Sequence, residues 1–139
     1  MSSQKLIAAA IALPALGEAL LRLHLRQDLR TLIPATWPLA PALPLPAPAL
    51  LARVTDRWLR WARHPRPCLP RSLALCLLLR RSGVPVVLHC GVQRPSASGD
   101  GGIKGHAWLS LHGQPYLEPQ AERLADFVET FRVPAAGLG

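Results

Sequence analysis

The sequence predicts an α+β domain in which helices come first and a small antiparallel sheet follows. Apolar residues recur at helical spacing in the first half of the chain. Short β-rich runs, separated by turn residues, fill most of the second half. Between them, the segment from Leu73 to Leu79 is apolar almost all round, which predicts a central, buried helix. Helices and a sheet that follow one another in this order form separate layers around one core.

Length and cysteine content suit a single domain in a reducing compartment. A chain of 139 residues can bury a core without disulfides or metals. Three cysteines are an odd number and form no CxxC pair, so we expect free thiols and a cytoplasmic protein. We expect one compact unit with two parts, a helical region over residues 1–64 and a core over residues 65–139.

The N-terminal region reads as helices joined by a proline-rich linker. Residues Ser3 to Leu32 read as one or two helices with a kink at Pro14, and prolines at about 34–48 then exclude helix. A helical pattern resumes from Leu50 to Ala62. The apolar side of this last helix is expected to hold Leu51, Val54, Trp58 and Trp61.

The first apolar run superficially resembles a targeting segment. Leu6 to Leu16 falls short of the roughly 20 apolar residues that span a bilayer. Charged residues from Glu18 onward interrupt it, and no small-residue cleavage site follows. Because leucines continue the helical spacing beyond Gly17, we favour an amphipathic helix that covers the core over a targeting segment.

The core region reads as one helix followed by short strands. Pro70 suits the first turn of a helix that continues from Arg71 to Arg81, and Gly83 supplies its stop signal. The segments expected after it are a strand from Val84 to Cys90, a loop from Gln93 to Gly105, a strand from His106 to His112, a turn at Gly113-Gln114 and a strand from Pro115 to Leu117.

The end of the chain is expected to form a closing amphipathic helix. Four apolar residues recur there at helix-like spacing, which predicts one face packed on the core. These residues are Leu124, Phe127, Val128 and Phe131.

The formal charge of +8 is nearly all arginine and is concentrated in the middle of the chain. Such a stretch fits an anionic partner, such as an acidic peptide, or a solvated helix face. No aromatic stacking platform or nucleic-acid motif accompanies it, so we expect no nucleic acid as partner. An anionic membrane also fits such a stretch, but we do not expect a membrane as partner. The arginines are Arg53, Arg57, Arg60, Arg63, Arg66, Arg71, Arg80 and Arg81.

Cys68 is the strongest candidate for a nucleophile because it stands where the central helix begins. Unpaired backbone N–H groups and the positive end of the helix dipole favour a thiolate there. A histidine brought beside it would complete a nucleophile–base pair, and His106 opens an apolar strand-like run. Glu118, from a neighbouring strand, is placed to orient that base. The sequence therefore predicts a cysteine hydrolase.

Other chemistries find less support in the sequence. Cys76 and Cys90 lie in apolar runs and read as packing residues. No serine-nucleophile elbow and no phosphate-binding loop is present. A zinc site would need residues whose spacing matches no zinc signature, so we expect no metal and no cofactor. Those residues are His89, Cys90, His106 and His112.

Several short motifs of the core region belong together: Cys68 to Leu75 (CLPRSLAL), the helix end Leu78 to Val84, Gly91-Val92, and Gly105 to Trp108 (GHAW). In this combination they resemble one family, the transglutaminase-like maturation proteases of lasso-peptide biosynthesis. The resemblance covers about Cys68 to Phe131, roughly half of the chain.

This resemblance implies a leader peptidase with a Cys–His–acid triad on a papain/transglutaminase-type core. Cys68 would be the nucleophile and His106 the base. Glu118 stands where the family usually has aspartate, and its longer side chain requires a slightly different backbone separation from His106.

The resemblance also implies partners. The substrate would be the leader peptide of a precursor, brought by a separate leader-recognition protein because this chain shows no leader-binding module. An asparagine-synthetase-like cyclase would use ATP to close the lasso ring of the product. Two alternatives remain open at this point: a noncatalytic scaffold that docks a partner or anionic membrane through its arginine-rich helix, and peptide transglutamination by the same triad.

Overall fold

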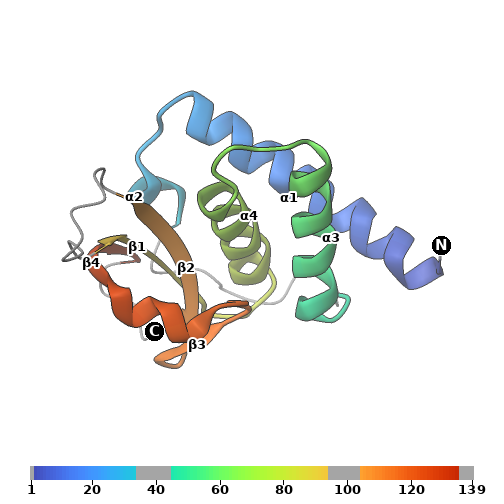
Figure 1. Ribbon diagram of the computed structural model, residues 1–139. Helices are drawn as coiled ribbons and strands as arrows, with labels where there is room; N and C mark the ends of the chain where they lie inside the picture. Colours follow the sequence, from blue (N-terminus) through green and yellow to red (C-terminus); the bar gives the residue numbers. More distant parts are fainter. Residues whose placement is uncertain (1, 34–44, 94–103, 135–139) are drawn as a thin grey trace.

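The protein has a layer of helices on one face of a four-stranded antiparallel sheet, as a computed structural model shows (Figure 1). Helix α4 (Cys68–Arg81) packs against strands of the sheet and against helices α1 (Ser3–His24) and α3 (Pro48–Trp61). The predicted α+β class is therefore confirmed. The structure describes residues 2–33, 45–93 and 104–134.

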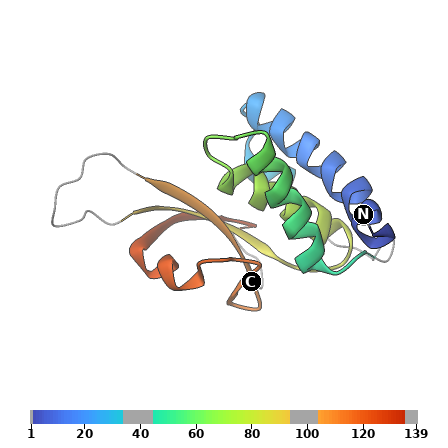
Figure 2. The same cartoon turned by 45° about the vertical axis from the view of Figure 1, so that its right-hand side comes forward.

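Helix α4 is the centre of the core. Figure 2 shows the sheet on one side of α4 and helices α1 and α3 on the other. The run from Leu73 to Leu79 is buried at every position except Leu78, which is partly buried. A helix covered on several sides needs apolar residues around its whole circumference, which explains the unpatterned sequence of this segment.

Helix α1 covers α4 with small residues. It continues through Pro14, and a single turn, α2 (Leu29–Leu32), follows it, in agreement with the predicted one or two helices. Among the described residues, α1 is the one helix long and apolar enough to cross a membrane, with 28% of its most apolar window buried. Its buried residues are Ala8, Ala12, Ala15, Leu16 and Ala19.

Helix α3 packs most of its expected apolar side on the core: Leu51 is buried, and Val54 and Trp58 are partly buried against it. The side chains of Leu51, Thr55 and Leu59, four residues apart, are buried, whereas Trp61 is 79% exposed. At about 100° per residue, Trp61 lies some 200° around the helix from Leu59 and so points away from the core. The prediction that Trp61 belongs to the buried side is wrong. The proline-rich linker before α3 lies largely outside the described residues.

The sheet has the strand order β3-β2-β1-β4, with every pair antiparallel. The hairpin between β2 and β3 turns at His112 and Gly113, which both have positive φ, one residue earlier than predicted. β1 begins three residues later than predicted, beyond Pro85. The predicted loop from Gln93 to Gly105 lies mostly outside the described residues. The strands are β1 (Val87–Gln93), β2 (Gly105–Leu111), β3 (Gln114–Tyr116) and β4 (Phe127–Val133).

The predicted closing helix is wrong, because a 3₁₀ helix, η1 (Ala121–Asp126), and strand β4 take its place. β4 carries a bulge: Thr130 is an extra residue between the partners of Gly91 and Cys90 on β1. Val128 and Phe131 therefore share one face of the sheet although they are three residues apart. A spacing of three is also that of a helix face, which explains why Val128 and Phe131 fit a helical pattern, whereas Leu124 lies in η1 and Phe127 on the other face of the sheet.

We predict that a chain starting at Pro65 will not fold on its own. It lacks α1 and α3, so the apolar surface of α4 that they bury would face water at a cost of about 25 cal/mol per Å². Several large side chains uncovered together exceed a stability margin of roughly 5–15 kcal/mol. Circular dichroism and gel filtration should show an unfolded or aggregated fragment; a soluble fragment with cooperative thermal unfolding would contradict this.

Candidate active site

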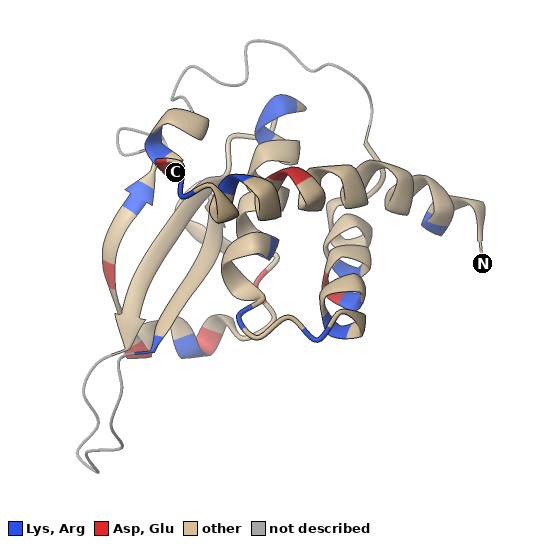
Figure 3. Ribbon diagram, turned by 90° about the horizontal axis from the view of Figure 1, so that it is seen from above, with Lys and Arg blue, Asp and Glu red and all other residues tan. Residues whose placement is uncertain are grey.

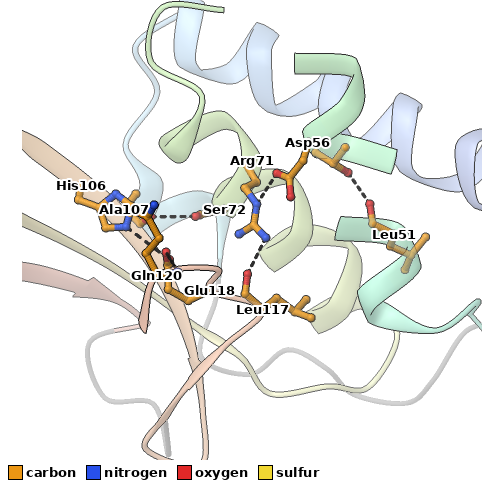
Figure 4. A network of polar contacts seen from close by, with 10 residues as sticks. Leu51, Asp56, Arg71, Ser72, His106, Ala107, Leu117, Glu118 and Gln120 are labelled. Carbon is orange, nitrogen blue, oxygen red and sulfur yellow. Dashed lines mark hydrogen bonds and ion pairs between the residues drawn. The ribbon is translucent and has the colours of Figure 1, made fainter. Parts of the chain in front are cut away.

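Cys68 is the first residue of α4 and lies against the open edge of strand β2. Strand β3 pairs with β2 only from Leu109 to Leu111, so the edge at Ala107 is left without a strand partner on that side. The N-terminal part of α4 occupies this edge, where the hydroxyl of Ser72, one turn after Cys68, donates a hydrogen bond of 3.1 Å to the Ala107 carbonyl (Figure 4). This contact sets the thiol beside the beginning of β2.

The structure brings the three residues singled out in the sequence together. The half-buried Cys68 thiol is hydrogen-bonded to His106, near the start of β2. Nε2 of His106 lies 3.4 Å from Oε2 of Glu118, just beyond β3 (Figure 4). The Glu118 side chain is 6% exposed and that of His106 is 24% exposed, so the acid is covered while the histidine remains accessible.

The three groups shift one another's protonation. Burial raises the pKa of the Cys68 thiol, but the hydrogen bond from His106 and backbone hydrogen bonds from Ala107 and Leu69 outweigh it, so the pKa is lowered. Hydrogen bonds to Cys68 and then to Glu118 raise the pKa of His106 to about 9, against the effect of burial. Both shifts favour the thiolate–imidazolium form of the pair over the neutral thiol and imidazole.

Glu118 stays ionised beside this pair. Burial raises the pKa of its carboxyl, but the hydrogen bond with His106 and the nearby charge of Arg71 contribute to a net lowering. A backbone hydrogen bond from Gln120, at 3.4 Å, acts in the same direction. A carboxylate held in this way can fix the orientation of the imidazole ring and stabilise its charged form.

Arg71 connects the acid to the helices, a role that is not apparent from the sequence, where Arg71 belongs to the basic stretch. Its guanidinium is nearly buried and donates from Nε to Oδ1 of Asp56 on α3 at 2.6 Å (Figure 4). The same group donates from Nη2 to the carbonyl of Leu117 at 2.5 Å. Leu117 has φ 54, an uncommon value for leucine, and directly precedes Glu118. The available signal was an arginine three residues after Cys68, just before the apolar run from Leu73 to Leu79.

Two aromatic rings support His106 from the sheet. Its ring lies 5.8 Å from that of Trp108 at an interplanar angle of 17°, and 5.2 Å from that of Phe127 at 37°. Gly91 makes this cluster possible, because a Cβ there would meet the Val128 carbonyl oxygen at 2.6 Å and the Trp108 ring at 3.1 Å. The missing side chain at Gly91 lets β4 and the tryptophan approach each other closely.

A second polar series supports Trp108 from its other side. The ring of His89 stacks on Trp108 at 5.5 Å and 7°, and its Nε2 lies 2.6 Å from the Ser110 hydroxyl. Its Nδ1 is hydrogen-bonded to Glu129. His89 and Ser110 are both 7% exposed, so the Ser–His pair is buried beneath the sheet surface and packs against Trp108, whereas the Glu129 side chain is 30% exposed. Within the described part of the chain, no three His, Cys, Asp or Glu residues are placed to hold a metal ion.

The other two cysteines differ electrostatically from Cys68. Burial raises the pKa of Cys76 to about 12. Burial, with smaller contributions from Cys68 and Glu129, raises the pKa of Cys90 to about 11. Both thiols therefore remain protonated near neutral pH, and only Cys68 among the three has the environment of a reactive thiolate.

A family model of the transglutaminase-like superfamily matches residues 4–132, nearly the whole chain. The chain belongs to the transglutaminase-like superfamily. The match includes α1 and α3 and so extends well before the segment from Cys68 to Phe131 in which the resemblance is visible by eye. Searches of curated proteins and of solved structures found no match. The superfamily includes cysteine peptidases and transglutaminases, so the fold is of the kind that supports acyl transfer through a cysteine.

In this transglutaminase-like domain a cavity of about 980 Å³ opens beside the thiol. Cys68, His106 and Glu118 line it on one side, and helix α3 lines it on the other. A site of this volume is within the usual range for ligand-binding clefts.

The electrostatics of the site predict selective labelling of Cys68. At neutral pH, iodoacetamide should alkylate Cys68 ahead of Cys76 and Cys90, because only Cys68 has a lowered pKa. The alkylation rate of Cys68 should fall only when the pH drops below the lowered pKa of its thiol. His106→Ala removes the hydrogen bond that lowers the pKa and should move the profile to higher pH. Peptide mapping by mass spectrometry at each pH gives the three rates, and equal rates for Cys68 and Cys90 would refute this account.

The aromatic support of His106 makes Gly91 intolerant of a side chain. Gly91→Ala should lower the free energy of unfolding by about 1–3 kcal/mol, since the new methyl group overlaps backbone of β4 and the Trp108 ring. It should also slow alkylation of Cys68. The matched control is Gly105→Ala, where the nearest atom to a Cβ is 3.7 Å away. Urea unfolding measures the free energy of unfolding of both variants. An equal loss of stability in the two would count against close packing at Gly91.

Proposed function

We propose that the protein is a cysteine peptidase that removes the leader peptide from a ribosomally made lasso-peptide precursor. The observation that carries this proposal is the hydrogen-bonded series of Cys68, His106 and Glu118 at the start of a central helix. It occurs in a chain of the transglutaminase-like superfamily, beside a cavity large enough for several residues of peptide. The motifs from Cys68 to Leu75 and from Gly105 to Trp108 point to the lasso-peptide members of that superfamily.

The first half of the reaction transfers the leader to the enzyme. The Cys68 thiolate attacks the carbonyl carbon of the bond that joins leader to core, and the carbonyl oxygen becomes an oxyanion. The backbone N–H of Cys68, in the first turn of α4, has no partner within the helix and can donate to this oxyanion. The imidazolium of His106 gives its proton to the departing amine as the C–N bond breaks. The leader is left as a thioester on Cys68.

The second half releases the leader. Neutral His106 takes a proton from water, and the hydroxide adds to the thioester carbonyl. When the C–S bond breaks, the leader leaves as a carboxylic acid that loses its proton to bulk water, and the thiolate and imidazolium of the resting enzyme are restored. Glu118 holds the imidazole ring throughout and stabilises its charged form.

The proposal includes partners that act before and after cleavage in the cytoplasm. A separate recognition protein would deliver the precursor leader, and an asparagine-synthetase-like cyclase would close the ring of the released core. Both follow from the resemblance to lasso-peptide proteases. A small precursor gene and a cyclase gene beside this one would support the pathway.

Substitution of the triad gives the sharpest test of the mechanism. Cys68→Ala and His106→Ala should each lower the rate of leader removal by on the order of 10⁴-fold or more, and the double variant should be little worse. Glu118→Gln should be slower than the parent but retain activity, because it orients the base rather than transferring a proton. Mass spectrometry of a precursor peptide with its recognition protein measures all four rates.

Cys90→Ser is the matched control and should cleave at the parental rate. Near-normal cleavage by Cys68→Ala would eliminate the mechanism. A noncatalytic scaffold predicts instead that Cys68 is no more reactive than Cys90 and that no variant changes the precursor. A transglutaminase predicts that an added primary amine becomes joined to the leader in place of water, which the mass of the product distinguishes.

A further inference from the structure

The cavity beside Cys68 is strongly cationic. Helix α3 forms one wall, and Figure 3 shows basic residues on this helix and on the turn that follows it. The acids that line the cavity are Asp56 and Glu118, and both are engaged, Asp56 with Arg71 at 2.6 Å and Glu118 with His106. The cations that line it are Lys5, Arg53, Arg57, Arg60, Arg63 and Arg71.

Four of these arginines have no acidic partner in the described part of the chain. Among the residues that the structure describes, no carboxylate lies within ion-pair distance of them. Each of the four side chains is exposed, so packing in the core does not explain why an arginine stands there. They are Arg53, Arg57, Arg60 and Arg63.

Their spacing forms a stripe that a peptide can follow. Arg53, Arg57 and Arg60 lie four and three residues apart, on one side of α3. The helix rises about 10 Å from Arg53 to Arg60 at 1.5 Å per residue. About three residues of extended peptide cover that length at roughly 3.3–3.6 Å per residue. We call Arg53, Arg57 and Arg60 the arginine stripe.

We infer that the arginine stripe binds an acidic segment of the peptide whose bond is cut at Cys68. This segment is three or four residues long and carries Asp or Glu side chains. This inference rests on the proposed function and names the class of its substrate. The stripe and the thiol line one cavity, so a peptide bound by the arginines lies in the same cavity as Cys68. A concave cavity of about 980 Å³ admits an extended peptide, whereas a flat bilayer surface cannot enter it.

The potential at the thiol can be tested without knowledge of the substrate. The rate of Cys68 alkylation by anionic iodoacetate, divided by that for neutral iodoacetamide, reports the positive potential of the cavity. The triple variant R53Q/R57Q/R60Q should lower this ratio about fivefold while leaving the iodoacetamide rate unchanged. The single variant Arg57→Gln should lower it less and serves if the triple variant folds poorly. Arg26→Gln removes an exposed charge that does not line the cavity and should leave the ratio unchanged.

Peptide binding is tested separately with fluorescein-labelled hexaglutamate and hexalysine. Fluorescence anisotropy should show that the full chain binds hexaglutamate but not hexalysine, and that the triple variant binds it at least about tenfold more weakly than Arg26→Gln does. Equal binding by the triple variant and the control would overturn the inference. So would binding of phosphatidylserine vesicles or single-stranded DNA in the absence of hexaglutamate binding. Hexaglutamate binding that depends on the stripe supports it even if no peptide bond is cleaved, in which case the proposed function alone fails.

Discussion

The docking of the N-terminal part of α4 on the uncovered edge of β2 is the contact on which the candidate site depends. Because β3 stops at Tyr116, the edge at Ala107 accepts a helix instead of a strand. One hydroxyl, that of Ser72, fixes the approach, and the thiol one turn earlier then lies beside His106. Helix-terminal N–H groups, strand-edge backbone groups and an imidazole thus converge on one sulfur atom, and together they overcome the cost of burying its charge.

The rest of the structure holds that arrangement from two sides. On the sheet, Trp108 and Phe127 confine the His106 ring, and the absent side chain at Gly91 lets them do so. On the helical side, Arg71 joins α3 to the backbone just before Glu118. The helices that cover the core therefore also position the acid, in keeping with a superfamily match that runs through both halves of the chain.

Much of this fold could be predicted from the sequence, and the failures have physical causes. The buried helix and the hairpin follow from local composition and turn residues, so their errors are shifts of a few residues at the ends. Strand β4 could not be recognised, because the bulge at Thr130 gives a strand the spacing of a helix. The proximity of Cys68, His106 and Glu118 was expected from residue chemistry, whereas the role of Arg71 depends on contacts with residues distant in sequence. Their catalytic roles remain predictions.

The bridging guanidinium of Arg71 has a consequence for how mutations would distribute over this gene. Since one side chain contacts α3, α4 and the segment that carries the acid, a fault in any of the three is transmitted to the others. Asp56, on a helix otherwise remote from the chemistry in sequence, belongs to the same unit as Glu118. Selection for activity should therefore constrain positions in the N-terminal half as tightly as those around the thiol, and a functional map of tolerated substitutions would not divide at the boundary between the two halves.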